Sequence, residues 1–157
     1  YEVLGVDNFF TGEKENIRDL LDNNLFELMR QGRLTVNDTG FGKMTFHDSC
    51  YLGRWNGIVD APRKLLQSMN KGQAIVEPAR NGYQGFCCGA GGGRMFMEET
   101  LGRRINVDRA EEVMGTGATT VAAACPFCAT MLSDGLMDKE SAIAVKDIAE
   151  LVDEATA

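Results

Sequence analysis

The residues of this chain that are best suited to chemistry are its five cysteines. They form three groups: Cys50 alone, the adjacent pair Cys87 and Cys88, and the pair Cys125 and Cys128. An interval of 36 residues separates the first group from the second, and the second from the third. Deprotonated thiols are soft ligands that select zinc, copper(I) or iron–sulfur clusters. The sequence therefore favours a thiolate metal site.

The number of thiols discriminates between these metals. Structural zinc takes four ligands in a tetrahedron, so five converging thiols exceed its needs, whereas a cluster of several irons can use them. Cys125-Pro-Phe-Cys128 taken alone is equally typical of a redox dithiol or of half a zinc site. Three interpretations stay open from the residues: an iron–sulfur domain, a structural zinc domain that docks partners, and a metal-free thiol–disulfide module.

A glycine-rich loop follows the cysteine doublet, with the sequence Gly89-Ala90-Gly91-Gly92-Gly93. Glycines allow close approach of the backbone, and their N–H groups can point at cluster sulfurs. We therefore predict that Gly89 and Gly91 help to bind a cofactor. The loop does not fit a dinucleotide site, because Arg94 replaces the third glycine of that fingerprint and no strand directly precedes the loop.

Short apolar runs alternate with helical patterns beyond residue 40. Strands are predicted near residues 44–46, 74–76, 119–124 and 143–145, and helices over 60–69, 97–114, 126–134 and 147–152. The sequence thus predicts the α/β class: a small parallel sheet of about four strands with helices on both faces, preceded by an N-terminal helix. Asp60 is the predicted N-cap of the second helix, with Pro62 in its first turn.

This order of elements positions the cysteines. Cys50 follows the first predicted strand, the doublet lies in the loop after the second, and Cys125 ends the third. The loops at the carboxyl ends of parallel strands share one edge of the sheet, where ligands bind. The five thiols are therefore expected to converge there.

The chain divides into two expected parts. Residues 1–42 are predicted as an N-terminal helical arm, because apolar residues recur at helical spacing from Ile17 to Met29. Residues 43–157 form the predicted cysteine-rich domain. Since Tyr1 reads as the middle of a sequence already under way, we expect a piece of a longer protein.

Composition excludes several classes of function. With 16 basic and 23 acidic residues the net charge is −7, which argues against nucleic-acid partners. No apolar run approaches the roughly 20 residues that span a bilayer, so direct membrane insertion is not expected. No secretory signal follows Tyr1, so we expect a cytoplasmic location and little support for a disulfide framework.

Three motifs resemble the cysteine-rich CCG domain of heterodisulfide reductase B subunits and glycolate oxidase iron–sulfur subunits. They are FHDSCYLGR at residues 46–54, FCCGAGGG at 86–93 and ACPFC at 124–128. The resemblance covers roughly residues 43–151. Residues 51–63 and 94–99 are most similar to membrane-bound iron–sulfur oxidoreductases linked to electron-transfer flavoproteins.

The resemblance implies a cofactor and a role. The five cysteines would bind a non-cubane [4Fe–4S] cluster, and the domain would pass electrons between a flavoprotein and quinone or reduce a disulfide. Because such proteins usually carry two of these domains, the resemblance implies that this chain is the C-terminal copy of a longer protein. Its expected partners are the other domains of that parent protein, with a second copy of the cysteine pattern, and flavoprotein subunits. The parent protein would be associated with a membrane. No catalytic residue is assigned in this piece.

Three further residues lie near the motifs. Arg54 and Arg94 each follow a cysteine loop closely and would offset the negative charge of a cluster, although a surface salt bridge explains each equally well. Arg94 is included in the predicted cofactor site. His47, the only histidine, is interpreted as a hydrogen-bonding neighbour of the site or as a strand-end residue satisfied by backbone, and not as a ligand.

Overall fold

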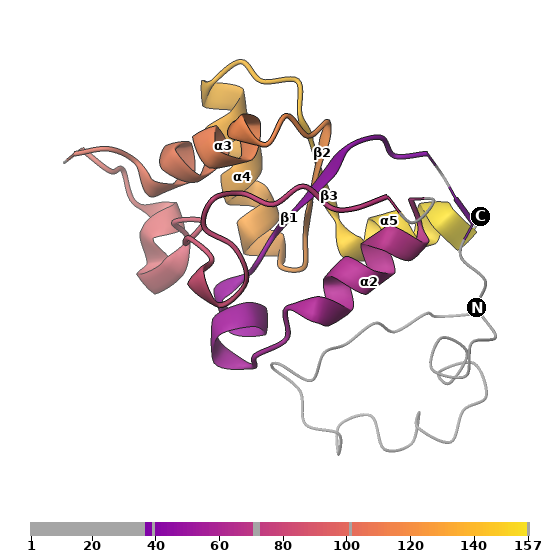
Figure 1. The fold of residues 1–157 in the computed structure, drawn as a ribbon. Coiled ribbons are helices and arrows are strands. Elements are labelled where there is room, and N and C mark those ends of the chain that lie inside the picture. Colours follow the sequence, from indigo (N-terminus) through magenta and orange to yellow (C-terminus); the bar gives the residue numbers. More distant parts are fainter. Residues whose placement is uncertain (1–36, 39, 71–72, 101, 157) are drawn as a thin grey trace, which may run out of the picture.

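The computed structural model describes residues 37–38, 40–70, 73–100 and 102–156. Its centre is a parallel sheet in the order β1 (Met44–His47), β2 (Thr120–Ala123) and β3 (Ala144–Asp147) (Figure 1). Met44 pairs with Thr120, and Thr120 with Ala144. The predicted α/β class is confirmed. The predicted helix between residues 17 and 29 lies outside the described residues.

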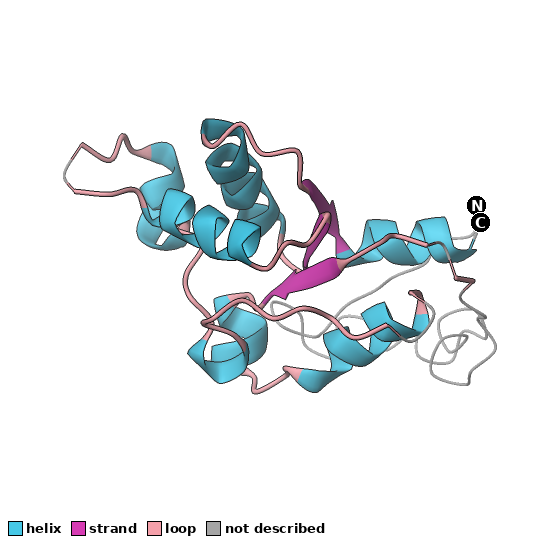
Figure 2. Cartoon of the chain, turned by 45° about the horizontal axis from the view of Figure 1, so that its top comes forward, coloured by secondary structure: helices cyan, strands magenta, loops and turns pink. Residues whose placement is uncertain are grey.

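Helices cover both faces of this sheet (Figures 1 and 2). α2 (Asp60–Ser68) and α5 (Ile148–Thr156) pack on one face, with Phe46 and Ala122. α3 (Ile105–Gly115) and α4 (Pro126–Asp138) pack on the other, with Val121 and Ala123. Because β2 is covered on both sides, all four of its residues are buried, which explains its run of small side chains.

The loops at the carboxyl end of the sheet contain three short helices. η2 (Cys50–Trp55) is a π-helix, and η3 (Gly82–Gln84) and η4 (Gly91–Phe96) are 3₁₀-helices. η2 begins soon after β1, whereas η3 and η4 flank the cysteine doublet. These segments, and the start of α4 after β2, therefore present the cysteines at one edge.

Three local predictions are wrong: a strand, a helix start and a helix cap. Residues 74–76 form no strand; Val76 N–H makes a single backbone hydrogen bond of 2.9 Å to Met44 O, and Pro78, which has no N–H, follows within two residues. Among the described residues the sheet thus has three strands, where about four are predicted. α3 begins at Ile105 rather than near residue 97, because the chain turns at Gly102 with φ of 72°. Asp60 is the first residue of α2, not its cap, which is Val59.

Alternation along β1 decides what faces the cysteines. Met44 and Phe46 enter the core beneath α2 and α5, so Thr45 and His47 point to the other face, toward α3. Within the part of the chain that the structure describes, none of the helices has the length and apolar content needed to cross a membrane.

Candidate metal centre

The five cysteine sulfurs form one group at the carboxyl edge of the sheet. Side-chain hydrogen bonds join Cys87 to Cys88, Cys88 to Cys128 and Cys128 to Cys125. Cys50 is close enough to Cys87 for its charge to raise the pKa of that thiol. Three segments far apart in the sequence therefore meet at one place, as their positions after the predicted strands indicate.

Exposure changes gradually across the group. Cys88 and Cys128 are 5% and 2% exposed, Cys87 and Cys125 are half-buried, and Cys50 is exposed. All five are free thiols. The group of sulfur donors is thus buried at Cys88 and Cys128 and open to solvent at Cys50.

The hydrogen bonds polarise the sulfurs. The thiol of Cys128 lies within hydrogen-bonding reach of both Cys88 and Cys125. This contact lowers the pKa of Cys88 and lowers that of Cys125 to about 6, where the N–H groups of Cys128 and Phe127 contribute as well. The pKa of Cys128 is raised, chiefly because it donates to Cys125, and that of Cys87 is raised, chiefly because it donates to Cys88. These contacts favour the thiolate form at Cys88 and Cys125, which is the form that binds metals.

Backbone N–H groups of the glycine loop also point at sulfur. Gly89 N–H donates to Cys87 Sγ over 3.3 Å, and the N–H of Ala90 lowers the pKa of Cys88. Gly89 has φ of 95°, and a Cβ there would lie 3.3 Å from the backbone nitrogen of Asn106. Glycine is therefore needed at this position both for the backbone turn and for close packing against α3.

The other predicted cofactor residues lie farther out. Gly91 is exposed at the start of η4, and Arg94 is exposed and pairs with Glu99 at 2.8 Å. Arg54 donates from Nη2 to Gly85 O over 2.6 Å and so ties η2 to the doublet loop. The roles of Gly91 and Arg94 at a cofactor stay predictions.

A buried arginine that the motif analysis missed stands behind the sulfurs. Arg109 of α3 is 0% exposed and donates from Nε to Nδ1 of His47 over 3.0 Å. Its Nη1 donates to Glu112 over 2.7 Å and to Arg80 O over 2.9 Å. The sequence does contain a signal for it, because Arg109 shares the apolar face of the helix with Ile105 and Val113, four residues away on either side.

His47 connects this arginine to the cysteines. It is 1% exposed and donates a side-chain hydrogen bond to Cys88. One of its ring nitrogens and the sulfurs of Cys88 and Cys128 all lie within 4.8 Å of one another. Burial, chiefly, and the charge of Arg109 lower the pKa of His47. Of the two predicted roles, the structure thus supports the hydrogen-bonding neighbour.

Asp48, the next residue, fixes the surrounding loops. Its carboxylate accepts two hydrogen bonds of 2.8 Å from Arg63 of α2 and one of 2.7 Å from Gly82 N–H of η3. Arg63 also pairs with Glu77 at 2.7 Å, and these two carboxylates, Asp48 first, raise its pKa. Because the carboxylate is buried, this bridge sets the path of the chain from η3 toward the doublet.

We expect Asp48→Ala to lower the free energy of unfolding by about 2–4 kcal/mol, because it leaves the Gly82 N–H without its acceptor and removes the buried carboxylate that accepts two hydrogen bonds from Arg63. Urea denaturation measures this loss. Lys146→Ala is the matched control, since it removes an exposed pair with Glu154 and should cost less than about 1 kcal/mol. Equal effects of the two substitutions would show that the buried bridge does not hold the loops.

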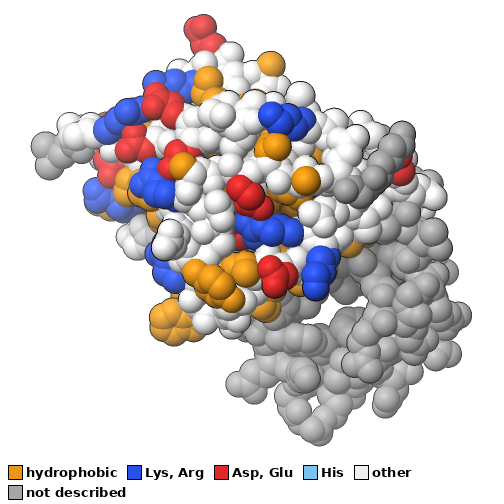
Figure 3. All heavy atoms as spheres, viewed as in Figure 1, with side chains coloured by type: hydrophobic (Ala, Val, Ile, Leu, Met, Phe, Trp, Pro, Cys, Tyr) orange, Lys and Arg blue, Asp and Glu red, His pale blue; other side chains and the backbone are white. Residues whose placement is uncertain are grey.

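A small cavity opens at the exposed end of the sulfur group. It has a volume of about 170 Å³ and is lined by Cys50, Tyr51, Arg54 and Trp55. Trp55 is 80% exposed. Figure 3 shows hydrophobic side chains gathered over the end of the molecule that carries η2. The rim next to Cys50 is therefore apolar and accessible.

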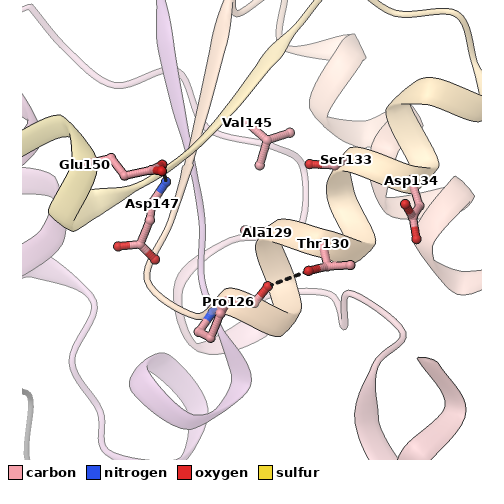
Figure 4. A pocket seen from close by; sticks show the side chains of 8 residues that line it. All are labelled: Pro126, Ala129, Thr130, Ser133, Asp134, Val145, Asp147 and Glu150. Atoms are coloured by element: carbon pink, nitrogen blue, oxygen red, sulfur yellow. Dashed lines mark hydrogen bonds between the residues drawn. The ribbon is translucent and has the colours of Figure 1, made fainter. Parts of the chain in front are cut away.

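A larger hollow of about 620 Å³ lies between α4, β3 and α5, and none of the five cysteines lines it (Figure 4). Several of its polar groups have local partners. Thr130 Oγ1 donates to Pro126 O over 3.0 Å, Asp147 N–H donates to Glu150, and Asp147 Oδ1 accepts from Ala149 N–H, which closes the start of α5. These groups stabilise helix ends, so the chemistry is assigned to the cysteine site.

The sequence profile of the cysteine-rich CCG domain matches residues 44–133, which contain all five cysteines. The chain belongs to this family. The match spans β1 through most of α4 and so includes every segment that brings a sulfur to the site.

Relatives of the CCG chain are iron–sulfur proteins and components of oxidoreductases. It is 45% identical over 130 residues to a probable iron-sulfur-binding oxidoreductase, FadF, of Bacillus subtilis strain 168, and 38% identical over 137 residues to the EtfAB:quinone oxidoreductase of Syntrophomonas wolfei. Each alignment covers 82% of this chain. Over 112 residues, 71% of this chain, it is 41% identical to one subunit of the dihydromethanophenazine:CoB–CoM heterodisulfide reductase of Methanosarcina barkeri.

The alignments cover only part of each relative. The chain spans 18%, 19% and 27% of these three proteins, respectively. No solved structure matches the chain significantly.

Proposed function

We propose that this CCG domain binds an iron–sulfur cluster through its five cysteines and passes electrons within a larger oxidoreductase. The observation that carries the proposal is the single hydrogen-bonded group formed by Cys87, Cys88, Cys125 and Cys128, with Cys50 at its open end. The family and the relatives agree with an iron–sulfur cofactor.

The donor set fits this cofactor. The five sulfurs exceed the four ligands of structural zinc, and the N–H groups of Gly89 and Ala90 already point at sulfur. The finer assignment is a non-cubane [4Fe–4S] cluster, with Gly91 and Arg94 at its outer side. When bound, such a cluster accepts and releases single electrons.

The residues of the chain would control this exchange. Cys88 and Cys128 lie on the dry floor of the site, which keeps water away, and the N–H donors offset negative charge on sulfur. At the rim, the apolar cavity beside Cys50 gives a partner access to the site.

The partners and the setting follow from the relatives as proposals. We assign the chain to one part of a longer oxidoreductase, with residues 43–157 as its CCG domain. A flavoprotein and a quinone are the proposed electron partners, because one relative is an EtfAB:quinone oxidoreductase. Quinones dissolve in lipid, so the parent protein would act at a membrane. Disulfide reduction is the second proposed reaction, by likeness to the heterodisulfide reductase of Methanosarcina barkeri.

A structural zinc domain is the alternative function. It is favoured by the close approach of His47, Cys88 and Cys128, whose donor atoms lie within 4.8 Å of one another. Cys125 would supply a fourth ligand, while Cys50 and Cys87 would have no role at the metal. This unused pair is the structural argument against zinc.

Metal analysis of the 157-residue chain separates the two functions. The chain is prepared anaerobically and incubated with iron and sulfide, or with zinc alone. We expect several irons per chain, a matching amount of acid-labile sulfide and broad visible absorption. One tightly bound zinc and no retained sulfide would overturn the iron–sulfur proposal, and binding of neither would leave a thiol–disulfide module.

A further inference from the structure

The contact between Arg109 and His47 determines which ring nitrogen of the histidine carries the proton. Arg109 Nε–H donates to His47 Nδ1 over 3.0 Å. A guanidinium has five N–H donors, no acceptor, and no accessible deprotonated form. Nδ1 must therefore be the unprotonated nitrogen that accepts this hydrogen bond.

The proton of the neutral imidazole is then on Nε2. His47 is 1% exposed, and because its Nδ1 accepts the hydrogen bond from Arg109, this nitrogen carries no proton, so the ring is neutral. Nε2–H can only donate, and the acceptor is the sulfur of Cys88, with which His47 makes a side-chain hydrogen bond. Arg109 thus donates to His47, and His47 donates to Cys88, while Arg109 also donates to the carboxylate of Glu112.

We propose that Arg109 is a positioning residue that locks His47 as the Nε2–H tautomer, so that His47 is a fixed hydrogen-bond donor to Cys88 and not a metal ligand. A metal on Nε2 would move the proton to Nδ1, where it would face the N–H of Arg109. Ligating histidines have the opposite arrangement, since their second nitrogen donates to an acceptor. Arg109 therefore opposes the use of His47 in a zinc site.

The environment of Arg109 supports a role beyond packing. Its Nη2 is buried without a hydrogen-bond partner among the described residues. A buried, incompletely satisfied guanidinium in a helix is costly, and an apolar side chain would fill the same space at lower cost. Glu112 holds the guanidinium in place and is itself held by Arg80, whose guanidinium lies 3.4 Å from the centroid of the Phe86 ring. These contacts thus connect Arg109 to Phe86, the residue that precedes the cysteine doublet.

The tautomer can be measured directly, because His47 is the only histidine of the 157 residues. The metal-free chain, freed of any histidine tag, is labelled with ¹⁵N-histidine, and long-range ¹H–¹⁵N correlations show which nitrogen is protonated. We expect Nε2–H with bare Nδ1. Protonated Nδ1 near neutral pH would overturn the inference. This experiment requires no cluster, so its outcome does not depend on the proposed function.

Arg109→Leu tests the positioning role. The ratio of Nε2–H to Nδ1–H is expected to fall about tenfold or more, because a charge-assisted hydrogen bond favours one tautomer by at least that factor. Arg103→Leu is the matched control, since Arg103 precedes α3 and is 54% exposed; it should leave the ratio unchanged. If folded Arg109→Leu had the same tautomer ratio as the unchanged chain, the positioning role would be contradicted. If this variant does not fold, Glu112→Gln takes its place. It weakens the hold on Arg109 and should shift the ratio in the same direction.

The consequence for a cluster rests on the proposed function. An N–H donor to a ligand sulfur stabilises the more negative, reduced state. In the reconstituted chain, His47→Leu is expected to disfavour the reduced state by about tenfold. For a one-electron couple this lowers the reduction potential of the cluster by about 59 mV. His47→Gln, which keeps an N–H donor, should restore part of the shift. Loss of a bound metal ion in His47→Leu with its retention in His47→Gln would identify a ligand and contradict the proposal.

Discussion

Replacing Cys88 by serine is expected to abolish cluster assembly. Cys88 is the centre of the sulfur group: it accepts hydrogen bonds from Cys128 and Cys87, contacts His47 and is 5% exposed. Loss of a partner outside the ligand shell already costs about 10–100-fold in metal affinity, so loss of the central ligand should cost at least as much. Iron and acid-labile sulfide per chain, after identical anaerobic reconstitution, measure the effect.

Two further variants, one at a second ligand and one serine control, complete the test of Cys88→Ser. Cys87→Ser should also prevent assembly, because the five-ligand site needs both members of the doublet. Ala129→Ser introduces the same hydroxyl one residue after Cys128 without removing a thiol, and it should keep full iron content. Circular dichroism should show the fold retained in all three. Full occupancy in both cysteine variants would exclude the five-ligand site.

The substitution Gly135→Ala is expected to destabilise the domain strongly. An alanine normally stabilises a helix interior relative to glycine by about 1 kcal/mol. At this position of α4, however, the added Cβ would lie 2.5 Å from Asn106 O and 3.1 Å from Ala110 Cβ of α3. Since backbone cannot move aside cheaply, we expect a net loss of about 1–3 kcal/mol, the usual cost of overpacking. Urea denaturation of the metal-free chain measures it.

Gly115→Ala is the control for helix propensity. Gly115 ends α3, is exposed, and has no heavy atom within 4 Å of an added Cβ. The same change should therefore be neutral or stabilise by up to about 1 kcal/mol. If Gly135→Ala were as well tolerated as Gly115→Ala, then α3 and α4 would not pack as closely as the structure has them.

Part of the candidate site could be predicted because spacing and periodicity are local properties. Cys50 and Cys125 follow apolar runs that form β1 and β2, and parallel strands must end at a common edge. The doublet lies at that edge as well, although the strand predicted before it is absent. Residues 74–76 still lie beside β1 through the Val76 hydrogen bond, so the chain arrives at the same place.

The boundaries and the role of Arg109 could not be predicted in this way. The glycine turn at residue 102 delays α3 by about two turns, and a helical pattern does not show where a loop closes. Arg109 occupies the apolar face of its helix, but the pattern does not name its partner, which lies 62 residues away in β1. Only packing of α3 against the sheet brings the two together.

The sequence by itself determined the chemistry of this protein: five soft donors, their grouping and the glycine loop beside them are covalent facts. The tertiary structure decided the environment of these donors. It set which thiols are buried, which N–H groups face sulfur, and which nitrogen of His47 carries a proton. The physical reason is that burial and hydrogen bonding depend on contacts between segments distant in the chain, and no local pattern of residues specifies their geometry.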